Sequence, residues 1–164
     1  MSQGALSDAD LRLLSALQRD ASLSHAELAE AAGLSRTSCW RRVQELRHAG
    51  LIEGQVTLLD PSKLGFGLLA LVSVAMVEHS ESIRDRFESH IAGVEEVLEC
   101  YATTGEWDYL LLVVSRDIQS FDRFLNERLL HHGTVRTTNS SFALRRIKYT
   151  TRLPLGGAGG GGST

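Results

Sequence analysis

The chain of 164 residues has room for two small domains, and its composition, 43% hydrophobic and 23% charged, is ordinary for a globular protein. Its net charge of -3 provides no general attraction to nucleic acid, so a nucleic-acid-binding function requires a local basic patch. No apolar run approaches the roughly 18 residues of a transmembrane helix, and no signal-peptide pattern occurs, so we expect a cytoplasmic protein with no membrane partner.

The N-terminal part is predicted to form three helices. Ser7 caps the first helix. Ser24 and Glu27 have the spacing of a capping box, in which each side chain accepts a hydrogen bond from the backbone amide of the other residue. Gly33 ends that second helix, because glycine adopts the left-handed conformation at low cost. Ser35 then caps the third helix after a tight turn.

The third helix is basic over much of its surface. Cys39, Val43 and Leu46 share one face and are predicted to be buried. Short polar residues stand at its N-terminal end, where a recognition helix meets phosphates and base edges. The alternative is that the arginines only form a solvated helix face. That alternative does not account for the tight turn that positions the helix pair. The predicted DNA-contacting residues are Ser35, Arg36, Thr37, Ser38, Trp40, Arg41 and Arg42.

A β-hairpin is expected after the third helix. Residues 51–56 have the pattern of its start, with Gly54 at the turn. A helix pair followed by a hairpin is the layout of a winged helix-turn-helix. We therefore expect a DNA-binding domain over residues 1–58, with double-stranded DNA as its partner. Residues 59–67, which contain Pro61 and two glycines, are predicted to be a linker.

The rest of the chain alternates between strand and helix patterns. Strands are predicted at 68–77, 94–103, 107–115 and 135–149, with helices at 81–90 and 119–130. The order βαββαβ is that of a ferredoxin-like sandwich, in which helices cover one face of an antiparallel sheet, so the whole chain is predicted to be α+β. This second domain is expected over 68–153, followed by a flexible glycine-rich tail at 154–164.

The sheet of the second domain has more apolar surface than one layer of helices covers. Val72, Val74, Leu110, Leu112 and Val114 are assigned to this surplus. Contact between subunits accounts for it most economically, so we expect at least a homodimer.

The segment from Thr103 to Asp108 has the chemistry of an amino-acid site. A glycine at a strand turn, here Gly105, exposes backbone amides that can bind a carboxylate, and Asp108 could face an ammonium group. The alternative is a plain hairpin in which Gly105 makes the turn and Asp108 caps it. The residues alone favour the plain turn.

Three segments together resemble the Lrp/AsnC transcriptional regulators: ELAEAAGLSRTSCWRRVQELRHAGLIEG, the junction DPSKLG, and LECYATTGEWDYLLLVV. The resemblance covers roughly residues 6 to 153. It implies a winged helix-turn-helix on a ferredoxin-like (RAM-type) domain. It also implies a nucleoid-associated, sequence-specific regulator whose assembly or DNA binding responds to a small effector, in this family an amino acid. The implied assembly is a homodimer that associates further, to an octamer. It also implies an effector site between subunits. The matching positions are Tyr101, Ala102, Thr103, Thr104, Gly105, Trp107, Asp108, Ile118 and Ser141.

The sequence favours neither an enzyme nor a cofactor. It contains no glycine-rich phosphate loop, nucleophile elbow or HExxH motif. His131 and His132 are adjacent and point in different directions, so we interpret them as a polar helix end and not as metal ligands. Two alternatives stay open. One is a sirohaem decarboxylase-like enzyme on the same fold, using these histidines with Arg136 and Arg145; the other is a nucleoid-organising DNA-binding protein with little sequence preference.

Overall fold

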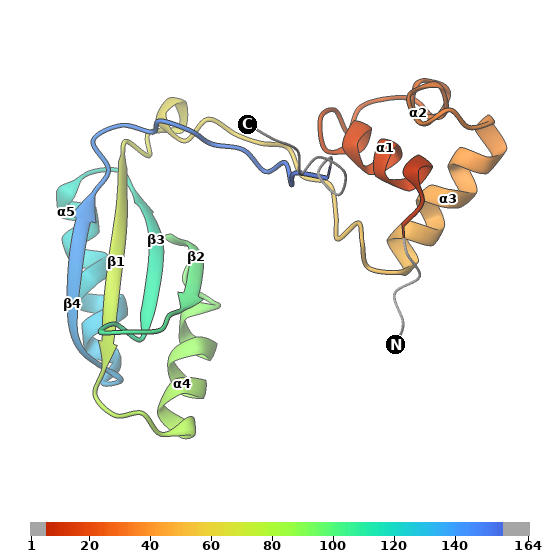
Figure 1. The fold of residues 1–164 in the computed structure, drawn as a ribbon. Coiled ribbons are helices and arrows are strands. Elements are labelled where there is room, and N and C mark those ends of the chain that lie inside the picture. Colours follow the sequence, from red (N-terminus) through yellow and green to blue (C-terminus); the bar gives the residue numbers. More distant parts are fainter. Residues whose placement is uncertain (1–5, 156–164) are drawn as a thin grey trace, which may run out of the picture. The chain divides into compact units, whose positions relative to one another are not determined.

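The computed structural model describes residues 6–155, and these divide between two compact units (Figure 1). The first unit contains residues 6–57 and 148–155, and the second contains residues 58–147. Within this described part, no helix is both long and apolar enough to cross a membrane.

The first unit is built on three helices, α1 (Asp8–Leu17), α2 (His25–Ala32) and α3 (Arg36–His48). The predicted caps are confirmed. Ser7 and Ser24 each accept a hydrogen bond from the backbone amide three residues on, and Gly33 ends α2 with a φ of 68°. The predicted inner face of α3 is also confirmed, because Cys39, Val43 and Leu46 are buried in one cluster with α1 and α2.

The predicted wing hairpin at 51–56 is wrong. The structure contains no strand between α3 and β1 (Leu68–Met76), only an exposed segment and a single 3-10 turn at Ser62–Leu64. Val56 and Leu59 are 83% and 68% exposed. A two-stranded hairpin without a further layer gains little from burial, and among residues 6–155 these side chains belong to neither hydrophobic core.

The second unit has the predicted βαββαβ order. After β1 come α4 (Glu81–Ile91), β2 (Val97–Ala102), β3 (Tyr109–Ser115), α5 (Ile118–Arg123) and β4 (Val135–Phe142). The four strands form one antiparallel sheet in the order β2-β3-β1-β4. The chain continues from α5 through a π-helical stretch, Phe124–Leu129, and a 3-10 turn, Leu130–His132. Both helices lie on the same face of the sheet (Figure 1).

The uncovered sheet face differs from the predicted one at two positions. Val72 and Val74 were assigned to it but are fully buried under the helices. The register explains this, because Val72 lies opposite Leu111 on β3, and successive side chains of a strand point to opposite faces. We use the name open sheet face for the surface on the other side. Its apolar members are Leu69, Leu71, Leu110, Leu112 and Val114.

The last strand is shorter than predicted. Strand β4 ends at Phe142, which lies opposite Ala70 near the start of β1, so the chain beyond it soon has no neighbouring strand. Leu144 and Ile147, which lie within the strand predicted at 135–149, are exposed. The chain then returns to the first unit, where Leu155 packs against the helix core. Only the first residues of the predicted tail, Pro154 and Leu155, fall within the described residues.

Candidate DNA-binding and effector sites

Helix α3 presents a polar, basic surface that begins at its N-terminus. The Ser35 hydroxyl accepts a hydrogen bond from the Ser38 amide at 3.2 Å, so the first turn is held firmly. Trp40 is 54% exposed, and the Arg41 side chain is 72% exposed with only a loose ion pair to Glu45 at 3.7 Å. We call this the recognition surface. It consists of Ser35, Arg36, Thr37, Ser38, Trp40 and Arg41, all exposed or half-buried.

Arg42, the last of the predicted DNA-contacting residues, differs from the others because its half-exposed side chain is bonded within the protein. Its guanidinium is turned toward α1, where its Nε and Nη2 donate to the two carboxylate oxygens of Asp10. Its Nη1 donates to Glu45 at 2.8 Å. All three nitrogens therefore have protein acceptors. The sequence could not reveal this, because Asp10 lies on a different helix.

The predicted effector loop is a closed turn between β2 and β3. The Thr103 amide donates to the Asp108 carbonyl oxygen at 2.9 Å, and the Thr103 hydroxyl donates to the Trp107 carbonyl oxygen at 2.6 Å. Gly105 has a φ of 118°, a conformation that other residues rarely adopt, and no atom outside residues 104–106 lies within 4 Å of where a Cβ would be. The turn thus exposes backbone at Gly105 to an approaching ligand.

Asp108 has partners within the chain. Its Oδ2 accepts a hydrogen bond from the Met76 amide at 2.8 Å, which ties the start of β3 to the end of β1. Its Oδ1 lies 3.1 Å from Nδ1 of His79, whose side chain is 80% exposed. The Asp108 side chain is 25% exposed. Asp108 therefore has a structural role in the turn through Oδ2. Its Oδ1, which faces the exposed His79 imidazole, is the oxygen that a ligand ammonium group could reach.

One protomer does not bring all the predicted effector positions together. Tyr101 and Ala102 lie on the edge strand β2, and Ser141 lies on the opposite edge strand, β4, three strand spacings or roughly 14 Å away. Ile118, which is 48% exposed, follows β3 at the end of the sheet remote from the turn (Figure 1). Strand β3 is roughly 20 Å long, which exceeds the length of an amino acid.

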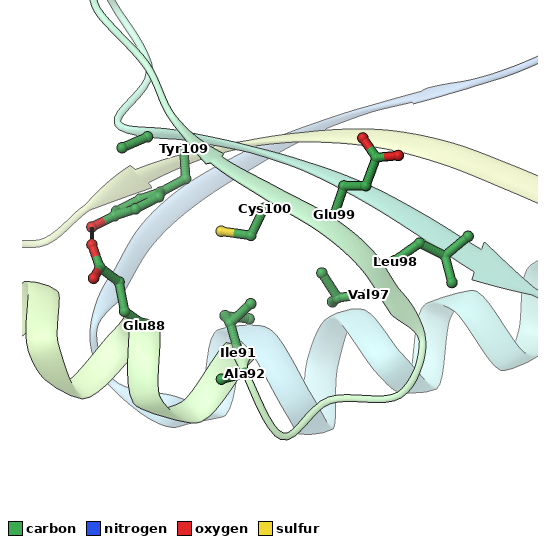
Figure 2. A pocket seen from close by; sticks show the side chains of 9 residues that line it. Glu88, Ile91, Ala92, Val97, Leu98, Glu99, Cys100 and Tyr109 are labelled. Carbon is green, nitrogen blue, oxygen red and sulfur yellow. Dashed lines mark hydrogen bonds between the residues drawn. The ribbon is translucent and has the colours of Figure 1, made fainter. Parts of the chain in front are cut away.

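A hollow of about 470 Å³ lies between α4 and β2, where sequence reasoning placed no site. Figure 2 shows the Cys100 side chain directed into it, while the Glu99 carboxylate points away from α4. At one end the Tyr109 hydroxyl donates to Glu88 at 2.6 Å; burial and this carboxylate raise the pKa of the phenol. Burial and Glu88 also raise the pKa of the Cys100 thiol, which therefore stays protonated at neutral pH. Among the predicted effector residues, Ala102 lines this hollow.

The two adjacent histidines occupy the 3-10 turn that ends the helical segment after α5. The His131 ring lies against the Asn126 carbonyl oxygen, whereas the His132 ring stacks on His90 with 4.0 Å between the ring centroids. They point in different directions, as expected. Within residues 6–155, no group of three or more His, Cys, Asp or Glu side chains is arranged to hold a metal ion.

Comparison with known families matches both parts of the chain. Residues 69–153 match the family model of the Lrp/AsnC ligand binding domain. Residues 6–53 match the model of a winged helix-turn-helix DNA-binding domain.

Curated relatives are similar over nearly their whole length. The DNA-binding transcriptional activator DecR of Escherichia coli (strain K12) is 40% identical over 146 residues, which are 89% of this chain and 96% of DecR. The glutamate uptake regulatory protein of Zymomonas mobilis is 38% identical over 150 residues, 92% of this chain and 91% of that protein.

Solved structures match equally well. A transcriptional regulator from Neisseria meningitidis, in complex with L-Met, has a TM-score of 0.88 and 37% identity, covering 93% of this chain and 98% of its own. An AsnC family regulator from Agrobacterium tumefaciens has a TM-score of 0.87 and 40% identity, covering 92% and 97%.

Proposed function

Because the chain belongs to the Lrp/AsnC family of transcriptional regulators, with a helix-turn-helix DNA-binding domain and a ligand-binding domain, we propose that it regulates transcription as a homo-oligomer whose DNA binding responds to an amino acid. The observation that carries the proposal is the recognition surface of α3. It combines a firmly capped N-terminus with exposed arginines, the arrangement that major-groove binding requires.

In this proposal, different residues of α3 make different contacts with DNA. Ser35, Thr37 and Ser38 lie nearest the helix N-terminus and contact phosphates or base edges. Arg36 and Arg41 neutralise phosphates or read guanine, because an arginine can bond two acceptors of one base. Trp40 packs against the DNA backbone. A dimer would present two such helices to half-sites roughly 34–36 Å apart.

The effector is proposed to be a free amino acid. Support comes from the similar Neisseria regulator, which was crystallised in complex with L-Met. In this chain, the exposed backbone at Gly105 suits the carboxylate of such a ligand, and Asp108 suits its ammonium group, which would displace His79 from Oδ1. Thr103, Thr104 and Trp107 complete the loop around that end.

We place the complete effector site between subunits. The loop from Tyr101 to Asp108 and the positions Ile118 and Ser141 are too far apart in one protomer to touch one amino acid. A second copy is therefore required if both groups line the same site. This geometry connects effector binding to assembly, since a ligand held by two subunits stabilises their contact.

The open sheet face is the proposed dimer contact. Leu71 is 43% exposed at its centre, and Leu69, Leu110 and Leu112 are only half-buried within the chain. The exposed segment from Val56 to Leu59 is proposed to add strand pairing between protomers. Assembly of dimers into larger rings, such as an octamer, would follow from contacts outside this face. We propose no enzymatic reaction.

The test combines DNA selection with ligand screening. Parent protein should enrich duplexes with two similar half-sites from a random-sequence library, and one or more amino acids should raise its melting temperature. Asp108→Asn should weaken that thermal response while leaving duplex binding largely intact. Enrichment of no sequence would refute the regulatory role. A variant that responds to every amino acid as the parent does would show that the loop is only a turn.

A further inference from the structure

A fully buried carboxylate joins the first helix to the recognition helix. Asp10 lies in the first turn of α1 with none of its side chain exposed. It accepts hydrogen bonds from the amide and the hydroxyl of Ser7, at 2.9 and 2.7 Å. The remaining approach to the carboxylate is taken by Arg42 of α3, whose Nη2 lies 2.7 Å from Oδ2. A buried carboxylate with this number of donors is fully satisfied.

The Arg42 guanidinium bonds acidic side chains on two helices. Besides the two bonds to Asp10, it donates to Glu45 on its own helix, so its fork is held between two acids. The hydrogen bonds from Arg42 hold the pKa of Asp10 well below its ordinary value, against the opposing effect of burial. The two acids in turn raise the pKa of Arg42. Moving this guanidinium to a DNA phosphate would leave a buried charge without a partner, which is costly.

We infer that Asp10 and Arg42 position the recognition helix, and that Arg42 is a positioning residue and not a DNA contact. The inference rests on the proposed DNA-binding function. Arg42 lies one residue from Arg41 and two from Trp40, so the pair fixes the rotation of α3 about its axis at the turn that carries both of them. The bond also ties this turn to the capped start of α1, which is itself held by Ser7.

Lysine at position 42 distinguishes positioning from phosphate contact. A lysine keeps the charge and can replace an arginine at a phosphate, but its single ammonium group cannot bond both oxygens of Asp10 as the planar fork does. If Arg42 contacts phosphate, Arg42→Lys should bind DNA almost as the parent does. If it positions α3, the variant should bind weakly although its charge is unchanged.

The experiment uses the full chain and a duplex that the parent has enriched from a random-sequence library. Affinity is measured over a range of salt concentrations at a temperature where every variant is folded by circular dichroism. Arg42→Lys and Asp10→Asn should each weaken binding, roughly 5- to 150-fold if one base contact is lost, without changing the slope of log affinity against log salt. Arg41→Ala should reduce that slope by about 0.9, as one lost phosphate contact does. Arg19→Lys is the matched control, since Arg19 is exposed on the same unit and, within the described residues, bonds only the Ser15 carbonyl oxygen.

The double variant provides a second readout. When Asp10→Asn and Arg42→Lys are combined, the loss should be no greater than in either single variant, because both break the same pair. Parent-like affinity for Arg42→Lys, tighter binding for Asp10→Asn, or additive losses would each overturn the inference while leaving the proposed function standing. A parent protein that enriches no duplex overturns the proposed function and the inference together.

Discussion

The open sheet face predicts that a single charge at its centre will separate the protomers. Leu71 on β1 retains 43% of its exposure in the isolated chain. Full burial of a leucine contributes roughly 1.5–3 kcal/mol, so burying the exposed 43% would contribute roughly 0.6–1.3 kcal/mol in each protomer. A symmetric dimer contains the residue twice, which makes the contribution roughly 1.3–2.6 kcal/mol.

Leu71→Lys should therefore raise the dimer dissociation constant at least roughly ten- to eighty-fold, and further because an ammonium group would be buried without a partner. Sedimentation equilibrium over a wide concentration range measures this change directly. Leu64→Lys is the control, because Leu64 is 50% exposed but lies in the 3-10 turn, outside the sheet. An unchanged constant for Leu71→Lys, or a parent mass near 18.0 kDa at every concentration, would refute the assignment of the open sheet face.

Two further predictions concern stability. The pKa of His132 is lowered from its ordinary value of 6.5 by burial, by His90 and by Arg86, so the unfolded chain binds more protons in that range. The free energy of unfolding should fall as the pH drops below about 6.5 and should fall less in His132→Gln; equal pH dependence in urea titrations of both proteins would contradict this. Gln18 exchanges two hydrogen bonds with the backbone of Leu153, at 2.8 and 2.9 Å, so Gln18→Ala should lower the stability of the first unit by about 1 kcal/mol. Deleting residues 153–164 should lower the stability of the first unit by at least as much. Unchanged stability in both variants would show that the segment around Leu153 does not stabilise the helix core.

Local chemistry made much of the fold predictable. The caps at Ser7 and Ser24 depend on residues three apart, and both formed as expected. The element order of the second unit follows from apolar runs and helical periodicity, and it is confirmed, as are the family and the regulatory function. The turn containing Gly105 was identified because the whole segment is contiguous in sequence.

Features that depend on distant partners were missed. Strand β1 is apolar at nearly every position, so alternation could not show which face Val72 and Val74 occupy; the pairing with β3 decides it. Arg42 is 32 residues from Asp10, and no local pattern connects them. The hollow between α4 and β2 arises from the packing of a helix on an edge strand, for which no sequence motif exists. The predicted wing hairpin at 51–56 was wrong because turn residues alone do not supply a layer for a hairpin to pack against.

In the proposed function, an amino acid bound near Gly105 and Asp108 changes DNA binding by the recognition surface. The most direct measurement is a titration of the parent protein against its enriched duplex, repeated with each proteinogenic amino acid at saturating concentration. We expect at least one amino acid to shift the affinity by roughly five-fold or more, the lower bound of typical coupling between sites, and Asp108→Asn to reduce that shift. Tight duplex binding that no amino acid alters would show that DNA binding by this protein does not respond to an amino acid.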